Sequence, residues 1–305
     1  MWPAHIGVLG RSRAEHATLP ASLICLTTHV SSTRQALDAA TDALRAAGVE
    51  DPRLDAEVML AEALGRDRAH LAANPEAETP PPVARRFAEM VRRRLRREPV
   101  AYILGRRGFR HLELAVDPRV LIPRPETELL VELARELRPR TVLDAGTGSG
   151  ALALAIAAEL TDAEVKATDV SPGALAVAAA NAERLGLADR VELFEGTVPP
   201  GGEEFDLVVA NLPYVSEREW GDLQREVTEW EPREALLAGP DGLDVLRSAV
   251  PVLAAVTGTL ALEIGQGQAA TVGELLRACG CQAVESRRDL AGIERLVIGS
   301  RDPEA

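Results

Sequence analysis

Hydrophobic residues between positions 32 and 98 recur at the three- and four-residue spacing of amphipathic helices. Leu37 and Leu44, with alanines between them, predict one helix. A second begins after Asp51, a capping residue followed by proline, and stops at Gly65. A third, longer helix follows three consecutive prolines and carries one apolar stripe: Val83, Phe87, Met90, Val91 and Leu95. These helices predict a small bundle over residues 32–98.

Residues 99–128 break this helical pattern. Apolar and polar residues alternate between positions 100 and 116, which predicts a β-hairpin. Residues 119–128 then read Arg-Val-Leu-Ile-Pro-Arg-Pro-Glu-Thr-Glu, with a helix start expected near Thr127. We interpret residues 99–128 as a hairpin followed by a hinge. The alternative for residues 123–128 is a stiff linker without a functional role.

From residue 141 onward, strand-like and helix-like segments alternate. This order is typical of a parallel sheet that helices cover on both faces. The segments are, in chain order, 141–143, 151–160, 165–168, 173–185, 191–194, 205–210, 243–255, 259–264, 269–278 and 296–298. Residues 129–305 therefore predict an α/β domain with a doubly wound, mostly parallel sheet.

The composition indicates a globular protein of enzyme size. The 305 residues are 46% hydrophobic, enough to bury the core of one large domain and a smaller one. Acidic residues outnumber basic ones by 47 to 34, and the net charge of −13 argues against a surface built to follow a phosphate backbone. The three cysteines cannot form a disulfide framework and lack the paired spacing of a zinc site, so no metal is expected.

No apolar stretch reaches the roughly 18 residues that a membrane-spanning helix requires. Residues 1–31 contain an apolar run, but Pro20 and the polar residues after the run are unlike a secretory signal. We therefore expect residues 1–31 to be a poorly ordered extension, and we expect the protein to be cytoplasmic.

The candidate chemistry begins with a glycine-rich turn after the first strand of the α/β domain. Residues 142–150 read Val-Leu-Asp-Ala-Gly-Thr-Gly-Ser-Gly, and the glycines let a ligand approach the backbone closely. The spacing differs from the G-x-G-x-x-G of dinucleotide sites, and the preceding carboxylate disfavours a pyrophosphate but suits an ammonium group. S-adenosylmethionine carries such an ammonium. The candidate cofactor-binding residues of this turn are Asp144, Gly146, Thr147, Gly148, Ser149 and Gly150.

Asp169 ends the next strand and supplies a second carboxylate at the same edge of the predicted sheet. A carboxylate can accept hydrogen bonds from both hydroxyls of a ribose, which S-adenosylmethionine also carries. The alternative for the glycine turn is a tight turn without a ligand. The two carboxylates, Asp144 and Asp169, favour the cofactor site over that alternative.

The strand-like run at residues 205–210 ends in Asn211, Leu212, Pro213 and Tyr214. The Asn211 carboxamide oxygen and the Leu212 carbonyl can both accept hydrogen bonds from a planar NH2 group, and the Tyr214 ring can cover the face of that plane. Few substrates besides amides and exocyclic amines need this arrangement. The alternative is a buried strand that Pro213 ends, with Asn211 as an ordinary turn residue.

Together, these residues resemble the site of methyltransferases that act on planar amide or amine nitrogens. A narrower resemblance, to the peptide chain release factor glutamine methyltransferases of the HemK-like family, covers about residues 32–299. It rests also on Val-Ala-Tyr-Ile-Leu-Gly at 100–105, Leu-Ile-Pro-Arg-Pro-Glu-Thr-Glu at 121–128, Glu-Pro-Arg-Glu-Ala-Leu at 231–236, Asp-Gly-Leu at 241–243, Leu-Glu-Ile-Gly at 262–265 and Asp-Leu-Ala-Gly at 289–292. The resemblance implies a seven-stranded sheet of the class I S-adenosylmethionine-dependent methyltransferase type. It also makes the helical bundle a substrate-docking domain.

The resemblance further implies the reaction. A methyl group would pass from S-adenosylmethionine to the side-chain amide nitrogen of the Gln in the Gly-Gly-Gln loop of release factors, which modulates translation termination. Asn211, Leu212, Pro213 and Tyr214 would be catalytic and substrate-binding, with Asn211 also next to the cofactor. The implied partner is a release factor; neither DNA nor a membrane is expected to bind, and the protein is expected to be a monomer.

The chain departs from the family pattern at two places. Leu212 stands where the family tetrapeptide usually has its first proline, a change that keeps the backbone carbonyl but removes the rigidity of the ring. Residues 195–198 lack the polar-then-Asp pattern that is usual beside the adenine, and Thr197 and Val198 are left as the candidate cofactor contacts there.

Two other functions stay open. A DNA adenine-N6 methyltransferase uses the same kind of tetrapeptide on an exocyclic amine, but it needs a basic cleft that the acidic composition does not favour. The second open function is that of a non-catalytic protein that binds release factors. The two departures from the family pattern support this alternative. A nicotinamide-dependent oxidoreductase is disfavoured because the glycine spacing differs from its fingerprint.

Overall fold

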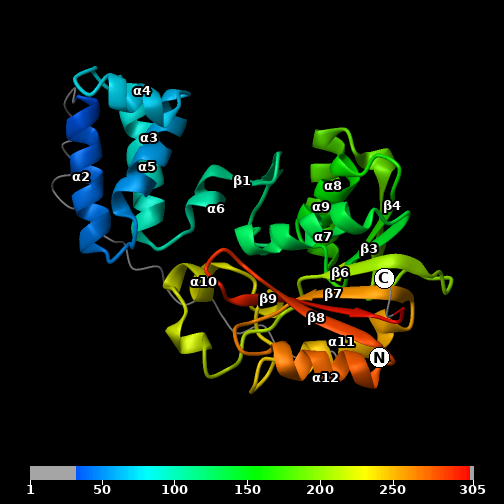
Figure 1. The fold of residues 1–305 in the computed structure, drawn as a ribbon. Coiled ribbons are helices and arrows are strands. Elements are labelled where there is room, and N and C mark those ends of the chain that lie inside the picture. Colours follow the sequence, from blue (N-terminus) through cyan, green and yellow to red (C-terminus); the bar gives the residue numbers. More distant parts are fainter. Residues whose placement is uncertain (1–31, 303–305) are drawn as a thin grey trace. The chain divides into compact units, whose positions relative to one another are not determined.

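The computed structural model describes residues 32–302, and these divide into two compact units between Arg96 and Arg97 (Figure 1). The extension that we predict for residues 1–31 lies outside the described residues. The second unit holds both the hairpin segment and the sheet. The finer division into residues 32–98, 99–128 and 129–305 stays a prediction.

The first unit is a bundle of helices, as the apolar spacing predicts, together with a short helix, α4, that the pattern did not reveal. Ser32 caps the first helix in a reciprocal capping box with Gln35, and Gly65 ends the second in the left-handed conformation at φ 64°. Apolar side chains such as Leu44, Met59 and Phe87 are fully buried in the bundle. Its helices are α2 (Thr33–Ala46), α3 (Pro52–Leu64), α4 (Arg68–Ala73) and α5 (Pro81–Leu95).

The second unit is built on a sheet that, within residues 32–302, has seven strands in the order β5-β4-β3-β6-β7-β9-β8. Neighbours from β5 to β7 run parallel, whereas β9 is antiparallel to both β7 and β8. The strands are β3 (Thr141–Ala145), β4 (Glu164–Asp169), β5 (Val191–Glu195), β6 (Phe205–Ala210), β7 (Thr257–Glu263), β8 (Ala283–Arg288) and β9 (Glu294–Ser300). The predicted doubly wound, mostly parallel sheet is thus confirmed. The apolar pattern did not reveal β8, because its residues are exposed or half-buried.

Alternation of side chains along the central strands builds one core on each face of the sheet. Val142 and Val209 join the core beneath α7 and α8, whereas Leu143 and Val208 join the core against α11 and α12 (Figure 1). Because helices cover both faces, the polar groups of the central strands gather at the strand ends. The main helices of this unit are α7 (Glu128–Leu137), α8 (Ala151–Glu159), α9 (Pro172–Leu185), α10 (Arg225–Trp230), α11 (Asp244–Ala254) and α12 (Ala269–Ala278).

The segment before the sheet contains the predicted hairpin, in a shorter form. The hairpin is confirmed at β1 (Arg106–Phe109) and β2 (Leu112–Ala115), whereas residues 100–104 form the helix α6 (Val100–Leu104) instead of a strand. Gly105 ends that helix in the left-handed conformation, at φ 73°. The shorter 3-10 turns of the unit are η1 (Pro125–Thr127), η2 (Ala188–Arg190), η3 (Trp220–Asp222) and η4 (Arg233–Ala235).

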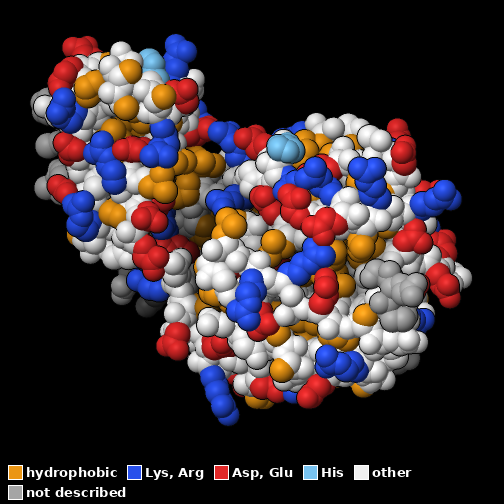
Figure 2. All heavy atoms as spheres, viewed as in Figure 1, with side chains coloured by type: hydrophobic (Ala, Val, Ile, Leu, Met, Phe, Trp, Pro, Cys, Tyr) orange, Lys and Arg blue, Asp and Glu red, His pale blue; other side chains and the backbone are white. Residues whose placement is uncertain are grey.

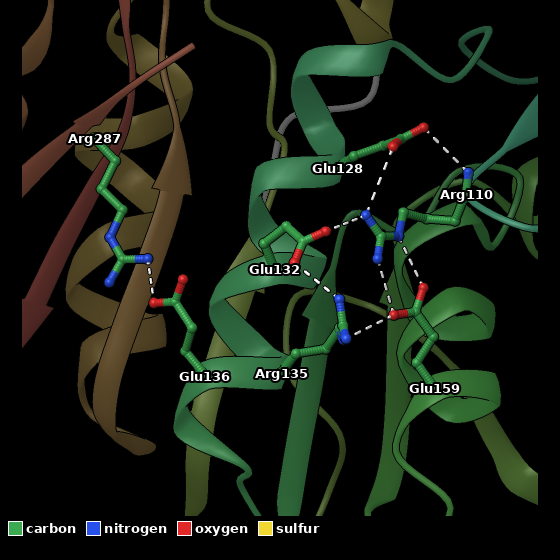
Figure 3. Close-up of polar contacts among 7 residues, drawn as sticks. All are labelled: Arg110, Glu128, Glu132, Arg135, Glu136, Glu159 and Arg287. Atoms are coloured by element: carbon green, nitrogen blue, oxygen red, sulfur yellow. Dashed lines mark hydrogen bonds and ion pairs between the residues drawn. The ribbon is translucent and has the colours of Figure 1, made fainter. Parts of the chain in front are cut away.

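Arg110, at the tip of this hairpin, fastens it to α7 and α8 (Figure 3). Its backbone N–H donates to Glu128 at 3.1 Å, and its guanidinium contacts Glu132 and donates to both oxygens of Glu159 at 2.8 and 3.0 Å. These bonds lower the pKa of Glu159. The hairpin is thereby held against the two helices α7 and α8, shortly before the chain reaches Thr127 of the site described next.

Candidate functional site

The candidate site lies at the carboxyl ends of two adjacent strands, β3 and β6. The chain adds β4 and β5 on one side of β3 and then crosses to add β6 and β7 on the other. Such a switch point is where open α/β sheets bind ligands. Ala145 and Ala210 are partners in the register, so the glycine turn and the tetrapeptide leave the sheet side by side. The structure therefore brings the two predicted halves of the site together.

The glycine turn is held by the strand next to it. The N–H groups of Gly146 and Thr147 both donate to the Thr168 carbonyl, at 2.8 and 2.9 Å. Gly146, Gly148 and Gly150 have φ values of 79°, 57° and 84°, the left-handed region that glycine adopts without strain. A side chain on Gly148 would meet no atom within 4 Å, so open space lies beside its backbone.

Asp144 is fully buried behind this turn. One carboxylate oxygen, Oδ2, accepts from the Thr147 hydroxyl at 2.6 Å and from the Ala153 N–H at 3.1 Å. The other, Oδ1, has no hydrogen-bond partner among the described residues. Burial raises the pKa of Asp144 to about 7, and the two hydrogen bonds oppose that rise. A buried acceptor without a donor fits the ammonium group for which the sequence predicts this residue.

Asp169 lies at the end of β4 and is half-buried. Its Oδ2 accepts from the Gly148 N–H and its Oδ1 from the Ser171 N–H, both at 2.9 Å. Each oxygen keeps a further acceptor position, so the carboxylate can still receive two hydroxyls. The next residue, Val170, is 68% exposed, which is unusual for a valine at a strand end.

The remaining predicted cofactor residues surround the turn. Ser149 is buried, and its carbonyl accepts from the buried Asn181 side chain at 2.9 Å. A side chain on Gly150 would clash with Leu154, so only glycine allows the helix to start here. Val198 follows β5, is half-buried and packs against the core that α11 and α12 cover.

The Asn211 side chain is half-buried and is held from one side. Its Nδ2 donates to the Thr127 hydroxyl at 3.0 Å. Thr127 in turn donates to Oε2 of Glu263 at 2.6 Å, and the Tyr214 hydroxyl donates to Oε1 of the same carboxylate at 3.1 Å. Residues from the end of η1, the loop after β6 and the end of β7 are far apart in the chain. They meet around the buried carboxylate of Glu263.

Leu212 and Tyr214 are tied to their neighbours in different ways. The Leu212 side chain packs so close to Gly146 that a Cβ there would lie 2.7 Å from its Cδ2. The Tyr214 carbonyl accepts from Nε2 of Gln268 at 3.0 Å and lies 2.4 Å from where a Cβ on Gly242 would be. Leucine at position 212 therefore supplies packing against the glycine turn. Pro213 stands half-buried between the two.

Sequence reasoning missed three residues of this arrangement: Thr127, Glu263 and Gln268. Thr127 and Glu263 lie in segments that carry the family resemblance, but no role was assigned to them. A signal existed for Glu263, because a lone carboxylate at the end of an apolar strand is unusual. Nothing in the sequence shows that Thr127 contacts Asn211 or that Glu263 contacts Thr127.

Some kinds of site are absent from residues 32–302. No cluster of His, Cys, Asp and Glu side chains in this range could hold a metal ion. Cys279 and Cys281 are free thiols. No helix formed by these residues has the length and apolarity that crossing a membrane would require.

The strand order, the antiparallel β9 and the loops at the switch point define a class I methyltransferase fold. Among solved structures, the catalytic domain of hMettl16 in complex with MAT2A 3'UTR hairpin 6 is similar, with a TM-score of 0.53 and 16% identity over 63% of this chain and 76% of that one. At this identity the likeness concerns the fold alone. Residues 127–213 match the family model for ribosomal protein L11 methyltransferase (PrmA).

The comparison with curated proteins is closer. The release factor glutamine methyltransferase of Moorella thermoacetica is 44% identical over 281 residues, which cover 89% of this chain and 99% of that protein. The protein of the same name from Geobacter sulfurreducens is 43% identical over 273 residues, 87% of this chain and 95% of that one. Residues 35–105 match the model for the PrmC N-terminal domain. The chain belongs to the release factor glutamine methyltransferase family.

Proposed function

We propose that this protein transfers a methyl group from S-adenosylmethionine to the side-chain amide nitrogen of the Gln in the Gly-Gly-Gln loop of peptide chain release factors. Family membership supports the substrate. One contact carries the proposal for the site: Nδ2 of Asn211 is bound to Thr127, which leaves Oδ1 to accept a hydrogen bond from the substrate amide.

The cofactor residues are proposed from the loops after β3, β4 and β5. Asp144 would pair with the ammonium through Oδ1, Asp169 would accept the ribose hydroxyls, and Val170 and Val198 would contact the adenine. The backbone of residues 146–150 gives the cofactor room for close approach. When bound, S-adenosylmethionine supplies an electrophilic methyl group on a sulfonium.

The acceptor residues would act by placement. An amide nitrogen is a weak nucleophile because its lone pair is delocalised into the carbonyl. The oxygen of Asn211 and the carbonyl of Leu212 would each accept one N–H of the Gln side chain and stabilise the positive charge that develops on nitrogen. Orientation of this kind can contribute roughly 7 to 11 kcal/mol at most. Tyr214 would cover the amide plane, and Pro213 would fix the turn that aims it.

The reaction needs no strong base in the site. The Gln nitrogen would form a bond to the methyl carbon as the carbon–sulfur bond breaks with its electrons left on sulfur, and the methylated nitrogen would then lose a proton readily to water. This agrees with the acceptor side, where the carboxylate linked to Asn211 through Thr127, that of Glu263, is 1% exposed and already accepts hydrogen bonds from two hydroxyls. The site therefore serves orientation rather than proton abstraction.

The rest of the proposal concerns the binding partner, the oligomeric state and the cellular location of the protein. The helical bundle of residues 32–98 is proposed to dock the release factor, and the protein is proposed to act as a cytoplasmic monomer. DNA is a less suitable acceptor. On the face that Figure 2 shows, acidic and basic side chains intermingle, whereas tracking of a phosphate backbone needs basic residues gathered together.

The test is methyl transfer with labelled S-adenosylmethionine and three acceptors. These are a release factor, the same factor with the loop Gln replaced by Asn, and a duplex DNA rich in adenine. We expect label in the first alone. Equal label in the Asn variant would overturn the assignment of the acceptor nitrogen, and label in DNA would favour the adenine-N6 alternative. No transfer to any acceptor, with cofactor binding intact, would favour the non-catalytic alternative.

A further inference from the structure

The hydrogen bonds around Thr127 run in one direction. A hydroxyl has a single proton, and Thr127 donates it to Oε2 of Glu263 at 2.6 Å. The Thr127 oxygen is then an acceptor only, and it receives Nδ2 of Asn211 at 3.0 Å. Thr127 is 5% exposed and Glu263 is 1% exposed, so water does not readily replace either partner.

We propose that Thr127 and Glu263 are positioning residues that fix the rotation of the Asn211 carboxamide, so that its oxygen faces the acceptor amide. This inference rests on the proposed function and deepens it. The two ends of a carboxamide have nearly the same shape, so packing alone does not choose between them. The orientation of the carboxamide is set by a partner that can only accept a hydrogen bond. Thr127 is such a partner because its single hydroxyl proton is already donated in the hydrogen bond to Glu263.

The reversed rotamer is harmful for a specific reason. If Nδ2 of Asn211 faced the acceptor, two NH2 groups would oppose each other, and the Gln N–H that the Asn211 oxygen is proposed to accept would have no acceptor there. An unpaired buried polar group of this kind corresponds to a factor of roughly 5 to 150 in an equilibrium or rate. If the Asn211 carboxamide is already correctly oriented in the free protein, this factor is not lost when the substrate binds.

Glu263 fixes the direction of the Thr127 hydrogen bond only in its ionised form. As a carboxylate it only accepts, from Thr127 and from the Tyr214 hydroxyl at 3.1 Å. Burial holds the pKa of Glu263 above its ordinary value with a small contribution from Glu126, and the hydrogen bonds from Thr127 and Tyr214 and the charge of Arg295 oppose that rise. A protonated Glu263 could donate a hydrogen bond to Thr127 instead. The Thr127 hydroxyl could then donate to Asn211, and the carboxamide orientation would no longer be fixed.

A matched pair of variants tests the proposal. Thr127→Val keeps the shape of the side chain but has no hydroxyl, whereas Thr127→Ser keeps the hydroxyl. We expect kcat to fall by roughly 5- to 150-fold in Thr127→Val and to stay within about threefold of the wild type in Thr127→Ser. The Kd of the cofactor should stay within a few-fold in both. Equal kcat values for the two variants would overturn the proposal.

A double variant separates positioning from a merely structural role. If Thr127 acts through Asn211, Thr127→Val should lower kcat in the wild type but add nothing in the Asn211→Ala background. Independent, additive losses in the two backgrounds would contradict the proposal. Thermal unfolding of all variants shows whether stability has changed as well.

A readout without turnover keeps this test distinct from that of the proposed function. In 15N-labelled protein, the side-chain NH2 of Asn211 should show one hydrogen-bonded, slowly exchanging proton in the wild type and in Thr127→Ser, and should lose it in Thr127→Val. If the proton is protected but release factors are not methylated, the proposed function fails and the positioning stands. If methylation occurs but the proton exchanges alike in all three proteins, the positioning fails.

Discussion

The cofactor half and the acceptor half of the site are held in place by different kinds of contact. In the proposed cofactor half, Asp144 and Asp169 accept hydrogen bonds from the backbone N–H groups of Gly148, Ala153 and Ser171, and Asp144 also accepts one from the hydroxyl of nearby Thr147. In the acceptor half, Asn211 and Tyr214 are fixed by side chains that lie 84 and 49 residues away in sequence. The cofactor half is therefore held mainly by contacts close in sequence, whereas the acceptor half depends on a few side chains that are distant in sequence.

This difference predicts how each half tolerates change. A carboxylate held by backbone groups stays in place when neighbouring side chains vary, because every residue except proline carries an N–H. A carboxamide held by one threonine loses its orientation when that threonine changes. Variants in the acceptor half should therefore alter kcat, and variants in the cofactor half should alter cofactor affinity.

The largest effect is expected for Asn211→Ala, which removes the proposed acceptor of the Gln amide. Loss of one preorganised hydrogen-bonding group at a reacting centre typically lowers kcat by roughly 10² to 10³. The Kd of the cofactor should stay within a few-fold, because the proposed role of Asn211 is to bind the substrate amide. Calorimetry and methyl-transfer rates measure the two quantities. A comparable loss of cofactor binding would contradict the division into halves.

Asp169→Ala should show the reverse pattern. Hydrogen bonds to a charged group contribute about 1.5 to 3 kcal/mol, so the cofactor Kd should rise by at least roughly tenfold. At saturating cofactor, kcat should approach that of the wild type. Asp189→Ala, at an exposed position in η2, serves as the matched control. An unchanged Kd would remove Asp169 from the ribose site.

A smaller effect, in pH dependence, is expected from Asp144. Burial raises its pKa to about 7, so the free protein holds a protonated carboxyl below that pH. A bound ammonium favours the ionised form, and the cofactor Kd should therefore fall as the pH rises towards 7, by at most about tenfold per pH unit. Calorimetry over this range measures the slope. The slope should vanish in Asp144→Asn; a slope that persists there would assign it to another group.

Tyr214→Phe is expected to have the smallest effect. The ring that would cover the amide plane remains, and only one of the two hydroxyls that donate to Glu263 is lost. We expect kcat to fall by less than about fivefold. Tyr214→Ala, which removes the ring as well, should lower kcat much further. Equal losses in the two variants would assign the role of Tyr214 to its hydroxyl.

Most of the fold could be predicted from the sequence. Apolar runs of strand length followed by helical periodicity gave the parallel sheet, because each strand buries both of its faces. The misses have physical causes. β8 is an edge strand without buried side chains, and residues 100–104 form a helix although their apolar alternation was read as part of a hairpin.

The site could be predicted only where its contacts are local. Asp144, Asp169 and Asn211 lie at or next to the carboxyl ends of their strands, and the topology of parallel strands brings such positions to one edge. Thr127 and Glu263 are 136 residues apart and meet because η1 passes beside the ends of β6 and β7. No spacing rule links two residues of that separation, so the support of Asn211 became visible only in the folded chain.

The most direct measurement is a crystal structure with S-adenosylhomocysteine and a Gly-Gly-Gln peptide bound. We predict that the Gln side-chain nitrogen lies within hydrogen-bonding distance of both Oδ1 of Asn211 and the Leu212 carbonyl, while Nδ2 of Asn211 stays on Thr127. An Asn211 side chain that points away from the peptide, or a Gln nitrogen held by other groups, would contradict the account.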